Sequence, residues 1–165
     1  MDPIAHASIA FLARPAAPKA HLLALLAATQ VPDLLFFAFE AAGIEHKAVT
    51  KMDFRRGLTY LSPARIPWSH GLTACIAWSA VAGALAALGY RDRRTGAIVG
   101  SLVFSHLVLD AIAYNNLPVA LDDAHKVGLG LVTTGAGLIA GILVEVALIA
   151  GGIAAFLHLH KEQHP

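Results

Sequence analysis

Three histidines and three carboxylates lie within stretches of this sequence that otherwise read as lipid-spanning. They are His6, Asp33, His70, His106, Asp110 and Glu145. An ionisable group in membrane hydrocarbon costs about 3 kcal/mol or more, so it is retained where it has a partner or a function. Imidazole and carboxylate are also the ligand types of zinc and related divalent ions. The sequence therefore predicts a metal site in a membrane protein, with zinc as the favoured ion.

Local spacing supports this prediction. His106 and Asp110 are four residues apart, so on a helix both side chains project from one face. They are either two ligands or a ligand and the carboxylate that orients it. Pro32 precedes Asp33, and a proline inside a helix kinks it and frees a backbone carbonyl, which turns a side chain towards a polar cavity. This pattern predicts that Asp33 faces the same site.

A third histidine follows the motif Pro67-Trp68-Ser69-His70. Proline is favoured in the first turn of a helix, and tryptophan is enriched at the depth of the lipid headgroups. We therefore expect a helix to begin at Pro67 and His70 to lie about one turn inside the membrane interface.

The composition indicates a small polytopic membrane protein. Of the 165 residues, 57% are hydrophobic and 14% are charged, and the mean hydropathy is +0.64, which is too apolar for a soluble domain of this size. A net charge of +1, with basic residues confined to loops, argues against a nucleic-acid partner. The lone Cys75 excludes an internal disulfide. No basic residue precedes the first apolar run, so we expect no cleaved signal peptide.

We predict an all-α integral-membrane bundle that forms a single domain over residues 1–165. A short helix precedes four segments that are long enough to cross the roughly 30 Å hydrocarbon layer. The expected segments cover residues 3–12, 20–42, 67–88, 95–115 and 127–157.

The depths of the polar residues agree with one another. Alternate crossing places the N-terminus and the loops 43–66 and 116–126 on one side of the membrane. At 1.5 Å per residue, five of the six groups then lie within about 15 Å of that surface. Glu145 reaches the same layer only if its helix begins near Thr133. His125 and Lys126 lie in a loop above the layer, where they are candidate contacts for a substrate anion.

The order of these motifs resembles the YdjM-like family of bacterial membrane-bound, metal-dependent hydrolases. The resemblance covers about residues 5–150. The matching elements are His6, Val31-Pro32-Asp33-Leu34-Leu35, Pro67-Trp68-Ser69-His70 and Ser105-His106-Leu107-Val108-Leu109-Asp110. It implies a helical membrane fold and a divalent-metal site. The matching site positions are His6, Asp33, His70, His106 and Asp110.

Our leading hypothesis is a membrane-embedded metal-dependent hydrolase that acts on a lipid-like substrate or on a phosphate or acyl ester. The residues expected to hold one or two zinc-like ions are His6, His70, His106 and Asp110. Asp33 would bridge the metals or orient a water, and Glu145 would complete the ligand shell or act as a base. The alternatives are a metal or proton transporter, which needs similar intramembrane groups, and a protein with a bis-histidine haem.

We expect a multi-pass protein of the cell inner membrane, in contact with lipid. Basic residues in short loops are retained in the cytoplasm. The dense turn at residues 91–94 (Arg-Asp-Arg-Arg) would therefore be cytoplasmic, and the metal site would face outward.

Overall fold

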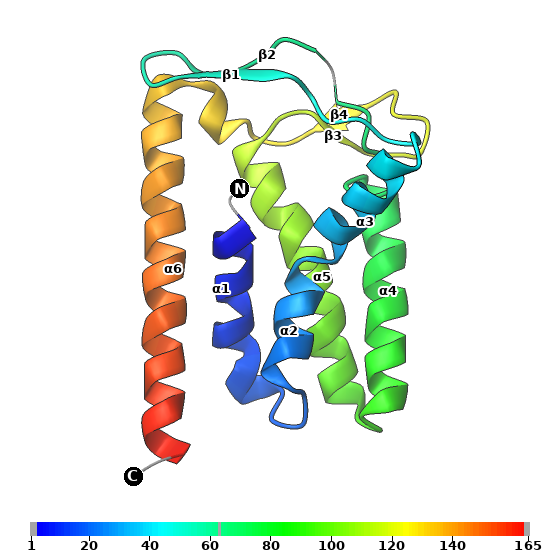
Figure 1. The fold of residues 1–165 in the computed structure, drawn as a ribbon, viewed down its shortest axis with the longest axis vertical. Helices are drawn as coiled ribbons and strands as arrows, with labels where there is room; N and C mark the ends of the chain where they lie inside the picture. Colours follow the sequence, from blue (N-terminus) through cyan, green and yellow to red (C-terminus); the bar gives the residue numbers. More distant parts are fainter. Residues whose placement is uncertain (1–2, 63, 164–165) are drawn as a thin grey trace.

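The computed structural model describes residues 3–62 and 64–163, which form helices with two short β-hairpins at one end (Figure 1). The α-helices are α1 (Pro3–Ala13), α2 (Leu22–Thr29), α3 (Val31–Ala41), α4 (Leu72–Gly89), α5 (Arg93–Ala113) and α6 (Gly135–Gln163). The strands are β1 (Thr50–Asp53), β2 (Gly57–Tyr60), β3 (Leu117–Pro118) and β4 (Lys126–Val127).

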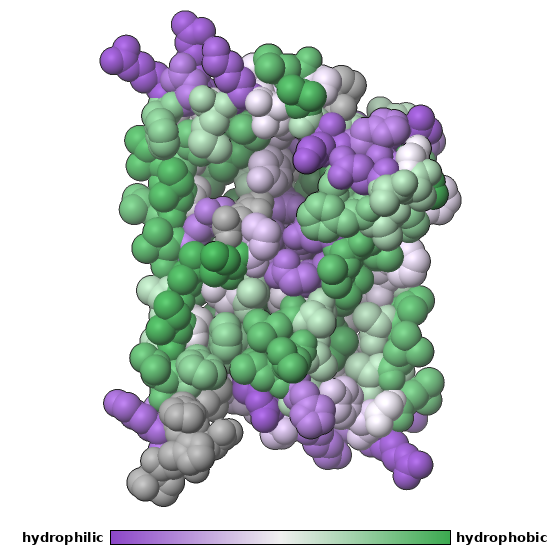
Figure 2. Space-filling view, viewed as in Figure 1, coloured by the Kyte–Doolittle hydropathy of each residue, from purple (hydrophilic) through white to green (hydrophobic). Residues whose placement is uncertain are grey.

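Among the described residues, three helices are long and apolar enough to cross a membrane: α4, α5 and the Gly135–His158 part of α6. The pair α2 and α3 makes a fourth candidate span, bent by 56° at its break. Large apolar side chains on these helices point away from the protein, with Leu88 75% exposed and Leu143 64% exposed. Figure 2 shows the same arrangement on one face, where apolar residues cover the sides and hydrophilic residues gather at both ends. A soluble monomer rarely exposes so large an apolar surface.

The bend between α2 and α3 follows from the proline predicted to kink this segment. Pro32 sits in the first turn of α3, where the missing N–H of proline costs nothing, and α2 ends at Thr29. The expected single helix over residues 20–42 is therefore two helices. As a result, the end of α2 and the start of α3 both lie inside the bundle.

Helix α1 is a half-span of 11 residues, as its length predicted. It starts part of the way down the bundle rather than in the layer of loops (Figure 1). Pro15 lies in a 3₁₀ turn that follows its end, and the helix packs against α2 and α6. This placement brings the first turn of α1 to the middle of the molecule.

Two glycines let α4 and α5 approach closely. A Cβ atom on Gly83 would lie 2.9 Å from the carbonyl oxygen of Gly96, and one on Gly100 would lie 2.8 Å from that of Ser79. Small residues at such a crossing allow backbone contact between helices in lipid. Asp92 begins α5 as its N-cap, since its carboxylate accepts a hydrogen bond from the backbone N–H of Thr95.

The all-α prediction is wrong at the loop end of the bundle, where there are two small antiparallel sheets. Strand β1 pairs with β2, with Thr50 opposite Tyr60, and β3 pairs with β4. Within each hairpin the backbone N–H and C=O groups form hydrogen bonds with each other, as buried backbone polar groups must. Gly57 has φ +87°, and a Cβ atom there would lie 2.5 Å from the backbone of Thr133. Glycine at this position therefore lets the first hairpin pack directly against the backbone before α6.

Two expected helix starts also differ. Helix α4 begins at Leu72, and residues 67–70 form the turn before it rather than its first turn. Helix α6 begins at Gly135 rather than at residue 127. This start lies close to Thr133, where the helix must begin if Glu145 is to reach the polar layer.

Candidate metal site

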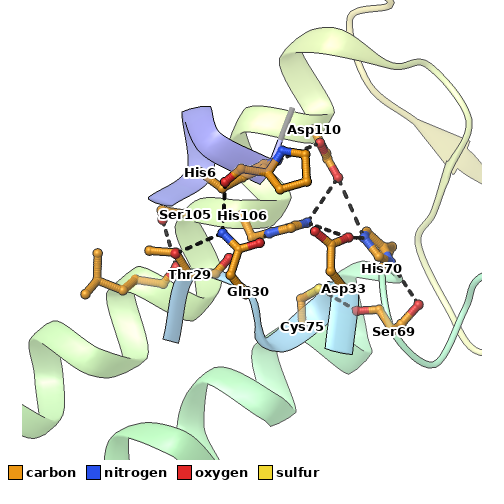
Figure 3. A network of polar contacts seen from close by, with 12 residues as sticks. His6, Thr29, Gln30, Asp33, Ser69, His70, Cys75, Ser105, His106 and Asp110 are labelled. Carbon is orange, nitrogen blue, oxygen red and sulfur yellow. Dashed lines mark hydrogen bonds and ion pairs between the residues drawn. The ribbon is translucent and has the colours of Figure 1, made fainter. Parts of the chain in front are cut away.

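Five of the six predicted residues meet at one point below the hairpins (Figure 3). They come from α1 (His6), the first turn of α3 (Asp33), the turn before α4 (His70), and α5 (His106 and Asp110). The three imidazoles and Asp110 are buried, with exposed fractions between 1% and 7%, and Asp33 is half-buried. The shared depth inferred from the sequence therefore corresponds to actual convergence.

All three imidazole Nε2 atoms face carboxylate oxygens. His70 Nε2 lies 3.4 Å from Asp33 Oδ1 and 3.8 Å from Asp110 Oδ2. His106 Nε2 lies 3.6 Å and 3.5 Å from the same two oxygens. His6 Nε2 lies 3.3 Å from Asp110 Oδ1. Asp110 thus presents one oxygen to His6 and the other to His70 and His106.

The hydrogen bonding of His106 identifies its protonated nitrogen. Its Nδ1 lies 2.8 Å from the backbone carbonyl oxygen of Thr29, at the end of α2. A carbonyl oxygen only accepts, so Nδ1 is the donor. In the neutral imidazole, Nε2 then carries a lone pair, and this lone pair points at oxygens of Asp33 and Asp110. Two acceptors face each other stably only when a proton or a cation lies between them.

The distances between these atoms are compatible with a metal ion. A charge-assisted hydrogen bond between an imidazolium and a carboxylate would bring the atoms to about 2.8 Å. The four contacts among His70, His106, Asp33 and Asp110 are instead 3.4–3.8 Å long. Two ligand atoms that each lie about 2.1 Å from a tetrahedral ion are about 3.4 Å apart. Among the described residues, two groups of three ligand atoms lie within 4.8 Å of one another and could each hold a metal ion: His6, His106 and Asp110, and Asp33, His70 and His106.

The bend between α2 and α3 creates this geometry. It exposes the carbonyl group of Thr29 to His106 and places Asp33 one turn later, on the opposite side of the same imidazole. Gln30, at the bend, donates a hydrogen bond of 3.0 Å from Nε2 to the carbonyl oxygen of Pro3. This bond fixes the start of α1, and with it His6, beside the cluster.

A buried carboxylate that the sequence analysis did not single out supports His70. Glu45 is fully buried in the segment after α3, and its Oε1 accepts hydrogen bonds from the backbone N–H groups of Trp68 and Ser69 at 2.7 Å and 3.0 Å. The Ser69 hydroxyl in turn lies 2.8 Å from His70 Nδ1. Glu45 thus holds the turn that presents His70 to the cluster, although no periodicity in the polar segment 43–66 marks it.

His6 and His106 stack face to face, with ring centroids 3.8 Å apart. Haem ligation needs two imidazoles on opposite sides of an iron, and this pair has no such arrangement. The His6 Nδ1 atom is buried and has no hydrogen-bond partner among the described residues. The stacked pair of His6 and His106 therefore does not suit a haem bound by both of these rings.

A cavity of about 400 Å³ opens directly on the cluster. Asp33, His70, His106 and Asp110 line it on one side. The hairpin β1–β2 and the segment before it cover it with Lys47, Thr50, Met52, Leu58 and Tyr60. An ion held by the cluster would therefore have one side accessible to a small molecule.

Glu145 does not join the cluster. It is half-buried on α6. Among the described residues, it belongs neither to the group of His6, His106 and Asp110 nor to the group of Asp33, His70 and His106. Its charge does act on Tyr114, which lines the cavity. Burial and the charge of Asp110 raise the pKa of Tyr114, and Glu145 adds to this rise. His125 is exposed and does not line the cavity.

Comparisons with models of known protein families, with curated proteins and with solved structures find no match for this chain. The geometry alone defines the class of site: a buried cluster of histidine and aspartate that could hold a metal ion, in a bundle with three helices able to cross a membrane.

Proposed function

We propose that this protein is a membrane-embedded, metal-dependent hydrolase, as its resemblance to the YdjM-like family implies. One zinc ion would be held by Asp33, His70, His106 and Asp110. His6 would hold the second oxygen of Asp110. The observation that carries the proposal is the Nε2 lone pair of His106 facing two carboxylate oxygens across 3.5–3.6 Å.

The composition of the site supports the proposal of hydrolysis. A bound divalent ion lowers the pKa of water towards 7 and polarises an ester oxygen. Within the protein, the carbonyl group of Thr29 orients His106, and the turn held by Glu45 fixes His70. The adjoining cavity admits a substrate beside the cluster.

The lower half of the bundle argues for hydrolysis over transport. Below the cluster, α1, α2 and α5 enclose an apolar core that includes Ala10, Leu25, Ala28, Leu102 and Val103, each at most 4% exposed. An ion pathway needs polar groups through the full thickness of the membrane. In the described residues, the His/Asp cluster lies on the hairpin side of this apolar core, which does not suit a continuous ion pathway.

The same arrangement supports action on lipid-like esters at one membrane surface. His106 lies seven residues before the end of α5, or about 10 Å along the helix from the loops. The basic turn between α4 and α5 lies at the opposite end (Figure 1). If this turn is cytoplasmic, the site faces outward. A reporter fused to the C-terminus tests this topology: a cytoplasmic signal agrees with it, and a periplasmic signal contradicts it.

The function is tested with detergent-purified protein and two chromogenic esters, p-nitrophenyl phosphate and p-nitrophenyl acetate. We expect hydrolysis that needs zinc, stops with chelator and is lost in His106→Ala. Hydrolysis that is equal with and without chelator, or zinc flux into liposomes without ester cleavage, would contradict the proposal.

A further inference from the structure

The roof of the cavity carries two hydrogen-bond donors that have no role in holding the cluster. Tyr60, the last residue of β2, lines the cavity, and its hydroxyl is buried without a hydrogen-bond partner among the described residues. Lys47, three residues before β1, lines the same cavity. A buried hydroxyl that lacks a partner loses a hydrogen bond that it would make to water, and a ligand oxygen can restore it.

We propose that Tyr60 and Lys47 bind the phosphate group of a phosphate ester whose apolar part occupies the rest of the cavity. This inference rests on the proposed function, since it names the substrate class of the same site. The phosphate would lie between the hairpin roof and the His/Asp cluster.

The charges of the cavity favour phosphate over a neutral acyl ester. Lys47 is the one cationic side chain among the described residues that line it, and the two lining carboxylates, Asp33 and Asp110, already face histidines. An acyl ester presents one carbonyl oxygen and no charge. A phosphate presents several oxygens and at least one negative charge, which suit a lysine, a hydroxyl and a divalent ion together.

The protonation state of Tyr60 fits a donor. Burial, with the charge of Asp110, raises the pKa of Tyr60 to about 12. The phenol therefore keeps its proton at neutral pH and donates a hydrogen bond.

The remaining lining explains why a plain phosphate ion would be an incomplete ligand. Phe36, Met52, Leu58, Ile66 and Leu117 contribute apolar side chains to the cavity. Burial of apolar ligand surface stabilises a complex. An alkyl group attached to the phosphate would contact these residues.

The test measures binding of inorganic phosphate to the full-length protein in detergent, zinc-loaded and chelated, by calorimetry. We expect Tyr60→Phe and Lys47→Gln each to weaken binding about tenfold or more, because each removes a charge-assisted hydrogen bond. Two matched variants should bind like wild type: Tyr90→Phe, near His21 at the opposite end, and Lys51→Gln, on β1 but outside the cavity lining. Zinc content should be the same in all five proteins.

A second arm identifies the source of the phosphate. Hexyl phosphate binding more tightly than inorganic phosphate would support a lipid-like ester. Equal affinities would show that the cavity recognises the phosphate group alone, which would contradict the part of the inference that concerns the apolar group. Hexanoate binding as tightly as hexyl phosphate would overturn the inference.

The outcomes separate the two proposals. If zinc binds normally but Tyr60→Phe and Lys47→Gln bind phosphate like wild type, the phosphate site is wrong while the metal site stands. If no zinc binds, but phosphate binding still depends on Tyr60 and Lys47, the phosphate site stands and the metallohydrolase is wrong.

Discussion

The imidazole rings of His6 on α1 and His106 on α5 stack with their planes 10° apart, and both present Nε2 to Asp110. Each ring contacts a different oxygen of this carboxylate, so Asp110 links the half-helix α1 to His106 on α5. Two imidazolium ions would repel each other at a centroid distance of 3.8 Å. The stack therefore suits neutral rings, which is the form that binds a metal.

Replacing His6 should weaken metal binding without abolishing it. In His6→Ala, Asp110 loses the partner of Oδ1 but keeps Oδ2 towards His70 and His106. Loss of a residue that orients a ligand typically lowers metal affinity about 10- to 100-fold. Chelator competition monitored with a zinc dye measures this change.

The same titration counts the ions. We expect one zinc per protein in wild type and in His6→Ala. Two ions in wild type and one in His6→Ala would mean that His6 is itself a ligand of a second ion, contrary to the arrangement proposed here.

Removing Glu45 should destabilise the turn that holds His70. Glu45→Ala leaves the N–H groups of Trp68 and Ser69 without their acceptor, which should lower the free energy of unfolding by about 2–3 kcal/mol. Glu45→Gln keeps an acceptor oxygen and should lose less. Denaturant unfolding in detergent measures both.

Glu40→Gln, on α3, is the control and should unfold like wild type. The affinity for zinc should fall in Glu45→Ala and recover in Glu45→Gln. Equal stability and zinc affinity in wild type and Glu45→Ala would show that the turn forms without this carboxylate.

Asp92 should make stability depend on acid pH. Its carboxylate accepts hydrogen bonds from Thr95 Oγ1 at 2.6 Å and Thr95 N at 2.9 Å and lies 3.5 Å from Lys19 Nζ. The two bonds from Thr95, helped by Lys19, lower the pKa of Asp92. A lowered folded pKa means that its stabilisation is fully present above the ordinary carboxyl pKa of about 4 and declines as the pH falls through the folded value.

Asp92→Asn tests this dependence in chelated protein, so that metal loss at acid pH does not contribute. The stability difference between wild type and Asp92→Asn should be largest near neutral pH and shrink below pH 4. A difference that is constant between pH 7 and pH 2.5 would exclude a role for the carboxylate charge.

The sequence predicted the membrane-type helices and the convergence of five polar residues because both depend on local patterns. Apolar runs set the lengths of the helices, the spacing of His106 and Asp110 set one face of α5, and Pro32 marked the bend that exposes Thr29. Depth along a helix is nearly fixed by residue number. Residues on four segments could therefore be assigned to one layer before their contacts were known.

Glu45 and Tyr60 were missed because their positions depend on the path of an irregular segment. They lie in the polar stretch 43–66, where the chain folds back over the bundle as a hairpin. The run Arg55-Arg56-Gly57 between short extended segments is the local signal of that turn. Even so, the burial of Glu45 against the turn before α4 depends on contacts 23 residues away, which no local pattern encodes.

The metal content of purified protein shows whether the His/Asp cluster binds an ion. Wild type and His158→Ala, altered near the exposed end of α6, should each retain one zinc per chain and melt at a lower temperature after chelation, because ligand binding stabilises the folded state. His106→Ala should lose the metal and become insensitive to chelator. Equal metal content in wild type and His106→Ala, with melting unaffected by chelator in both, would contradict the account and leave His106 as a hydrogen-bonded packing residue.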